Sequence, residues 1–91
     1  MMKKSIYIVT SNDVEKRFQG AYSSLGAAVK GAKTMILAFS HEAWLNFVDI
    51  RKDEDGKVKA IVNGTAVIES MGEPAEWYEF DYEVREVEVQ D

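Results

Sequence analysis

The chain has 91 residues, a formal net charge of −5 and no cysteine. Its length suits one domain with one core, so residues 1–91 are expected to form a single domain. The sequence offers neither a disulfide nor a thiolate metal site, which is typical of a reducing compartment. The apolar run near the start is too short for a signal peptide, and no stretch reaches the roughly 18 apolar residues of a membrane span. We therefore expect a cytoplasmic protein with no membrane partner.

The charge is unevenly distributed along the chain. Residues 1–48 contain six basic and three acidic side chains, a balance of +3. Residues 49–91 contain five basic and thirteen acidic side chains, a balance of −8. An acidic chain is poorly suited to contact nucleic-acid phosphates, so no direct nucleic-acid partner is expected. The same balance favours solubility and a basic partner.

The first half of the chain predicts two strands and a helix. Ser5–Thr10 is apolar on both faces, which is typical of a strand inside a sheet. Lys16–Ser23 is expected to be a second strand, with a bulge or a close backbone approach at Gly20. Ser24, or its rival Ser23, then caps a helix over about residues 24–39. Apolar side chains recur there at steps of three and four residues: Leu25, Ala28, Val29, Ala32, Met35, Ile36 and Phe39.

The segment after the helix can be interpreted in two ways. In one, the helix is followed by a strand over Trp44–Lys52. In the other, Thr34–Phe39 is a strand and Ser40–Lys52 a second helix, because apolar residues also keep helical spacing there. We prefer the first, since the Asp53–Gly56 segment is a polar turn of the kind that joins two antiparallel strands.

The second half predicts only strands. Lys57–Val62 alternates between apolar and polar residues, the Asn63-Gly64 pair is a typical hairpin turn, and Thr65–Ser70 is expected to be the return strand. Trp77–Val89 is the last strand, with a bulge or bend near Arg85 where the alternation changes phase. The predicted fold class is α+β, with an antiparallel-rich five- or six-stranded sheet and one main helix, about residues 24–39, packed on one face.

Few residues in the chain are suited to catalysis. His41 is the only histidine, and neither a catalytic triad nor a zinc helix can be assembled around it. The Asp53–Gly56 segment fails as a calcium loop, because Arg51 and Val62 would occupy ligand positions. The glycines form no phosphate-binding loop. We therefore predict no catalytic residue, no bound cofactor, no metal site and no enzyme activity.

The last strand contains the most informative surface pattern. Glu79, Asp81 and Glu83 are expected on one face, about 6.8 Å apart, opposite a row of aromatic residues. This ladder could imitate a row of phosphates and bind a partner, or it could be a solvated face offset by lysines and arginines on neighbouring strands. The predicted partner-binding residues are Glu73, Glu76, Glu79, Asp81, Glu83, Glu86 and Glu88.

Four segments of the chain resemble a known group of proteins. They are IYIVTSN at residues 6–12, GAYSS at 20–24, SLGAAVKGAK at 24–33 and YEVREVEV at 82–89. Together they resemble small uncharacterised accessory proteins of bacteriophages and prophages. The resemblance implies a phage accessory protein, acting in the host-cell cytoplasm, that blocks a host or defence protein. Its motifs are strand and cap patterns, so it assigns no functional residues.

Three functions are open at this point. The leading hypothesis is a small acidic, non-enzymatic protein that binds and inhibits a host or defence protein through its acidic second half. An alternative is a structural or assembly module that forms a homodimer through a sheet edge or the helix. The third is a small ligand-binding protein or enzyme, which would require a well-formed pocket lined by His41 and buried carboxylates.

Overall fold

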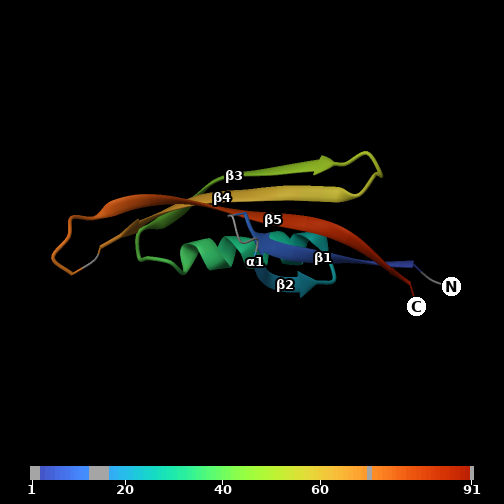
Figure 1. The fold of residues 1–91 in the computed structure, drawn as a ribbon, viewed down its shortest axis with the longest axis horizontal. Coiled ribbons are helices and arrows are strands. Elements are labelled where there is room, and N and C mark those ends of the chain that lie inside the picture. Colours follow the sequence, from blue (N-terminus) through green and yellow to red (C-terminus); the bar gives the residue numbers. More distant parts are fainter. Residues whose placement is uncertain (1–2, 13–16, 70, 91) are drawn as a thin grey trace.

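The computed structural model describes residues 3–12, 17–69 and 71–90 (Figure 1). It contains five strands and one helix. In chain order these are β1 (Lys3–Ser11), β2 (Phe18–Tyr22), α1 (Leu25–Leu37), β3 (Ala43–Lys52), β4 (Val58–Ile68) and β5 (Glu76–Gln90). The predicted second strand began at Lys16, and the predicted return strand ended at Ser70; both residues lie outside the described part of the chain.

The five strands form one sheet in the order β2-β1-β5-β4-β3, and each strand is antiparallel to its neighbours. The molecule is long and narrow, with overall extents of 58 × 23 × 22 Å, and α1 lies along one face of the sheet (Figure 1). The predicted α+β class is wrong. The structure is a small β-rich domain, because β5 alone has 15 residues and the helix only 13.

Helix α1 follows from its apolar stripe and its cap. The Ser24 hydroxyl accepts a hydrogen bond from the Ala27 amide at 3.1 Å, which satisfies one of the free N–H groups that open a helix. The helix ends at Leu37, two residues before the predicted end at Phe39, and both of these side chains are exposed. The helix-then-strand interpretation is confirmed, since β3 follows directly. The side chains that α1 buries are Ala28, Val29, Ala32 and Ile36.

The predicted hairpin turn at Asn63-Gly64 is wrong. Both residues lie inside the continuous strand β4 and are buried. Gly64 occupies the point where Ile36 of α1 approaches the sheet, and a Cβ atom added at Gly64 would overlap the Ile36 side chain. Glycine is therefore needed here for a close approach between helix and strand, not for a turn.

Strand β5 keeps one register along its whole length. It pairs with β1 from Lys3 to Ser11 without a shift, so the bulge predicted near Arg85 is wrong. The change in pattern has another cause, because Val87 lies opposite Ile6 on the face that carries no helix. The bulge expected at Gly20 is found beside it, where the pairing of β1 with β2 skips Gln19.

The two faces of the sheet differ in what covers them. We call the side that packs against α1 the helix face and the other side the open face. The core lies on the helix face and includes Val9, Val62, Tyr82 and Val84 together with the buried side of α1. Because side chains alternate along a strand, the odd-numbered residues of β5 from Trp77 to Val89 lie on the open face. That face carries the acidic residues Glu79, Asp81 and Glu83 and the basic residues Lys59 and Arg85.

Candidate functional site

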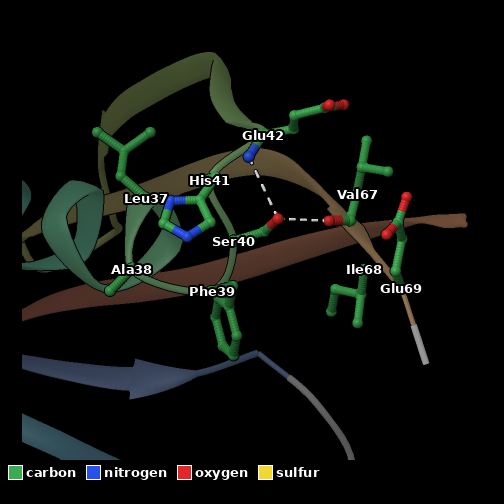
Figure 2. A pocket seen from close by; sticks show the side chains of 9 residues that line it. All are labelled: Leu37, Ala38, Phe39, Ser40, His41, Glu42, Val67, Ile68 and Glu69. Carbon is green, nitrogen blue, oxygen red and sulfur yellow. Dashed lines mark hydrogen bonds between the residues drawn. The ribbon is translucent and has the colours of Figure 1, made fainter. Parts of the chain in front are cut away.

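A pocket of about 730 Å³ lies beyond the C-terminal end of α1 (Figure 2). Ser40 and His41 both line it, but they do not form a catalytic pair. The Ser40 hydroxyl donates to the Val67 carbonyl oxygen at 2.5 Å and accepts from the Glu42 amide at 3.2 Å. Since its proton is already used to hold the loop against β4, this serine lacks the base contact that activates a nucleophile.

The polar turn after β3 is the hairpin turn expected from the sequence. Asp53 Oδ1 accepts hydrogen bonds from the amides of Asp55 and Lys57, both at 2.9 Å, and Gly56 has a φ of 78°. The Asp53 carboxylate thus closes the turn. In the described residues, no three side chains from His, Cys, Asp and Glu lie together in a way that could hold a metal ion.

The seven predicted partner-binding carboxylates do not share one face. The alternation along β5 divides them, and Glu73 lies exposed in the turn before the strand. The open face carries Glu79, Asp81 and Glu83, as the sequence indicated, and the helix face carries Glu76, Glu86 and Glu88.

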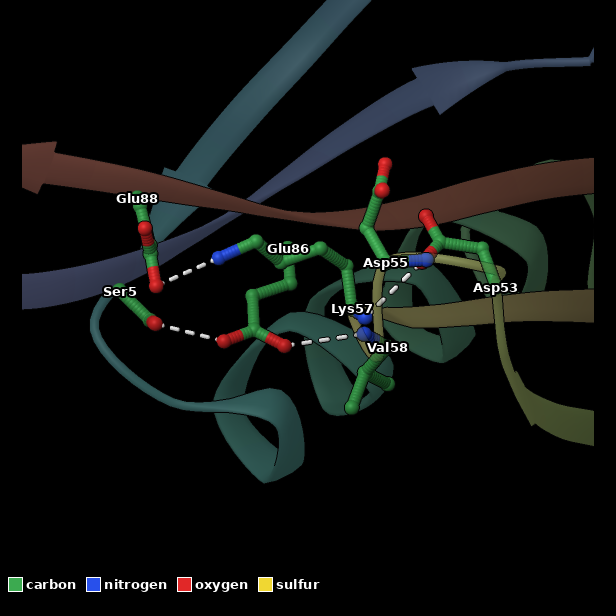
Figure 3. A network of polar contacts seen from close by, with 7 residues as sticks. All are labelled: Ser5, Asp53, Asp55, Lys57, Val58, Glu86 and Glu88. Carbon is green, nitrogen blue, oxygen red and sulfur yellow. Dashed lines mark hydrogen bonds and ion pairs between the residues drawn. The ribbon is translucent and has the colours of Figure 1, made fainter.

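Two of the carboxylates on the helix face connect β5 to other parts of the fold (Figure 3). Glu86 accepts hydrogen bonds from the Ser5 hydroxyl at 2.6 Å and from the Val58 amide at 2.9 Å. These bonds favour the charged form and lower the pKa of Glu86. Glu88 pairs with Lys57 at 2.6 Å, and this bond raises the lysine pKa. Both carboxylates therefore help to hold β5 against β1 and against the start of β4.

We expect Glu86→Gln to make unfolding less sensitive to acid. The lowered pKa means that wild-type Glu86 stabilises the fold above the pKa of the unfolded chain, about 4.3, and that this contribution is lost as pH falls through the folded-state value. Urea midpoints measured from about pH 6 to about pH 2.5 should therefore fall less steeply for the variant than for the wild type. Equal slopes would contradict the role of Glu86.

A row of three cations crosses the open face. Arg51, Lys59 and Arg85 lie opposite one another on β3, β4 and β5. Glu83 contacts two of these cations and is only 3% exposed, with Arg85 Nη2 at 2.6 Å and Lys59 Nζ at 3.6 Å from its Oε1. Like charges opposite one another destabilise a sheet, and Glu83 offsets that repulsion. Its carboxylate is consequently engaged within the chain and unavailable to a partner.

Another part of the open face combines exposed aromatic rings with carboxylates. Trp44 and Trp77 meet edge to face with ring centroids 5.4 Å apart, although they are 38% and 72% exposed. Glu79 lies opposite Thr65, which is also the register partner of Trp44, so the carboxylate and the indole flank the same residue of β4. We call this region the aromatic–acidic site, comprising Trp44, Phe47, Trp77, Glu79 and Asp81.

A buried asparagine holds the acidic side of this site in place. Asn63 is 2% exposed, and its Nδ2 donates to Glu79 Oε1 at 2.9 Å and to Asp81 Oδ1 at 2.5 Å. Its Oδ1 accepts from Asn46 Nδ2 at 2.8 Å, and Asn46 also donates to Thr65 Oγ1. The amide therefore draws the two carboxylates together beside the aromatic rings.

Sequence reasoning identified the acids of this site but missed the rest. The sequence pattern of Asn63 predicts a turn residue, and the predicted strands do not bring Trp44 together with Trp77 of the last strand. The alternation of β4 could have indicated the placement of Asn63, since a strand continuing from Val62 puts its side chain on the face opposite that of Val62. The pairing of Trp44 with Trp77 has no local sequence signal, because it depends on the strand order.

Comparisons with protein families, characterised proteins and solved structures found no match to this chain. Within the described residues, α1 is the one helix, and it lacks the length and apolar character needed to cross a bilayer.

Proposed function

We propose that the protein is a non-enzymatic binding module that recognises a basic segment of a partner protein through the aromatic–acidic site. The observation that supports this is the exposed edge-to-face pair of Trp44 and Trp77 beside the carboxylates of Glu79 and Asp81. Arginine and lysine side chains bind carboxylates by charge-assisted hydrogen bonds and also stack on aromatic faces. A surface that offers both contacts side by side suits a cationic side chain.

The exposure of the aromatic rings supports the same proposal. Trp77, Phe47 and Trp44 are large apolar side chains on the uncovered face of the sheet. Tryptophan and arginine are enriched among the residues that dominate binding energies, and clustered exposed apolar groups often mark interaction surfaces. Two carboxylates next to aromatic rings, and not all seven predicted acidic residues, make up this binding surface.

The class of partner follows from the charge and from the resemblance. The site carries negative charge in a chain of net charge −5, so the complementary surface is positive. The resemblance to phage accessory proteins would make the partner a host or defence protein and place the encounter in the host cytoplasm. Binding that covers an arginine- or lysine-rich functional surface of such a protein would inhibit it without any chemical step.

The tryptophans provide a direct test of the site. The chain contains two tryptophans, and both belong to it. We expect an arginine-rich peptide of about ten residues to change the intrinsic fluorescence in a saturable way, and added salt to weaken the response, since exposed charge pairs are screened. A glutamate-rich peptide of equal length is the control. Identical responses to the two peptides, or none to the arginine-rich peptide, would refute the proposal.

We expect Trp77→Ala to weaken binding of the arginine-rich peptide at least about tenfold, as hot-spot truncations do. Trp44 remains as the fluorescent reporter. The double variant Glu79→Gln with Asp81→Asn keeps acceptor oxygens for Asn63 but removes both charges, and it should weaken binding and flatten the salt dependence. Lys30→Gln, an exposed change on α1, is the matched control. Unchanged affinity in both site variants would show that the peptide binds elsewhere.

A further inference from the structure

Strand β3 has a neighbour on one side only, among the strands that the structure describes. It is ten residues long, whereas β2 at the other edge has five residues and a bulge. An outer strand presents unpaired N–H and C=O groups that can pair with another chain, and proteins usually protect long edges with proline, lysine or bulges. The bulge in β3 lies between Leu45 and Phe47, so residues 48–52 form a regular stretch of edge.

The side chains of this stretch are arranged so that the edge is complementary to itself. Asp49 and Arg51 lie on the open face and form an ion pair at 2.9 Å along the same strand, with side chains 41% and 77% exposed. Ile50 lies between them on the other face and is also exposed. In an antiparallel pair of identical strands related by a two-fold axis at Ile50, Asp49 of each copy lies opposite Arg51 of the other.

Neighbouring two-fold registers lack this match. A pairing centred on Asp49 places two aspartates opposite each other, and one centred on Arg51 does the same with two arginines. A pairing centred on Val48 leaves Asp49 opposite Phe47. Only the register centred on Ile50 pairs both charges with their opposites and buries an exposed isoleucine against its own copy.

We propose that two copies of this chain pair through their β3 strands in the register centred on Ile50. This pairing joins the two sheets into one continuous sheet. The paired stretch is short, because the Asp53–Gly56 turn ends the strand on each side. A contact of this size supports a weak dimer, with a dissociation constant of about 1–100 µM. Trp77, Glu79 and Asp81 lie on β5, two strands away from the edge, so this part of the aromatic–acidic site stays accessible in the dimer. Trp44 and Phe47 lie on β3 itself, just before the paired stretch of residues 48–52.

Sedimentation velocity of the unmodified chain from about 1 µM to about 500 µM gives the first test. The sedimentation coefficient should rise with concentration from the monomer value to the dimer value. The variants Asp49→Arg and Arg51→Glu should each remain monomeric to concentrations at least about tenfold higher, because each creates two like-charge pairs across the axis. An equimolar mixture of the two variants should form a heterodimer, because every facing pair is again opposite in sign.

The mixing experiment separates this register from other modes of association. Lys30→Glu changes the charge of an exposed α1 residue by the same amount as Arg51→Glu and should leave the dimer intact. A wild-type chain that stays monomeric at every concentration would overturn the proposal. So would a dimer that survives both single variants, or a pair of folded monomeric variants that fail to associate when mixed. Circular dichroism of each variant confirms that it is folded.

Discussion

Replacing Gly64 with alanine is expected to lower the free energy of unfolding by about 3 kcal/mol, at the upper end of the usual cost of overpacking a core. The new Cβ would overlap the Ile36 side chain and lie 2.8 Å from the Trp44 carbonyl oxygen. Ile36 is fully buried and the carbonyl belongs to the neighbouring strand, so neither atom can move away cheaply. Either α1 must lift from the sheet or β3 must shift relative to β4.

Gly26→Ala is the matched control for this prediction. No heavy atom lies within 4 Å of a Cβ added at Gly26, which is exposed on α1. Alanine is the better helix former, so this variant should be more stable than the wild type by up to about 1 kcal/mol. Urea unfolding followed by far-UV circular dichroism compares the two variants. If Gly64→Ala were as well tolerated as Gly26→Ala, the close approach of helix and strand would not matter to stability.

The second large effect is expected from Asn63→Asp. This change replaces the amide nitrogen of the buried side chain that holds the two carboxylates of the aromatic–acidic site with an oxygen. The Asn63 amide nitrogen donates to Glu79 and Asp81, and an aspartate would put a third carboxylate in its place. A buried charge that faces like charges instead of a partner costs about 3 kcal/mol or more. We therefore expect the variant to be strongly destabilised at neutral pH.

The loss of stability in Asn63→Asp should depend on pH in a defined direction. Burial and the two neighbouring carboxylates raise the folded-state pKa of the introduced group above the unfolded value of about 3.9. The penalty is therefore small below about pH 4, grows as pH rises, and is complete above the raised folded-state pKa. Gln19→Glu, which adds one exposed negative charge to β2, should not show this profile. A constant loss of stability from about pH 4 to about pH 8 would contradict the explanation.

The local elements could be predicted where a short-range rule decides the structure. The helix starts at the serine cap, because a side-chain acceptor and an apolar stripe coincide there, and the turn at Asp53–Gly56 follows from its residue types. The Asn63-Gly64 prediction failed because the same residue types serve a long-range purpose. There the glycine admits Ile36 of α1, and the asparagine binds carboxylates of β5, which local sequence cannot indicate.

The candidate site was predictable only in part, for a related reason. Alternation along the last strand correctly placed Glu79, Asp81 and Glu83 on one face. Among the groups that engage these carboxylates, Asn63 and Lys59 come from β4 and Arg85 from β5 itself. Glu86 on the other face is bonded to Ser5, 81 positions away in the sequence. Which acids are already bonded within the chain therefore depends on the strand order. Periodicity specifies where a side chain points but not what it meets.

The position of β5 has a consequence for how the protein is made. This strand is the last described one in the chain, yet it lies between β1 and β4 and closes the sheet. During synthesis the β1–β2 and β3–β4 hairpins are made first. The edges of β1 and β4 that pair with β5 stay unpaired until β5 has been made. Pairing β1 with a strand as distant in the sequence as β5 slows folding. A chain truncated before β5 would leave two hairpins that, within the described residues, share no strand pairing and meet only through α1.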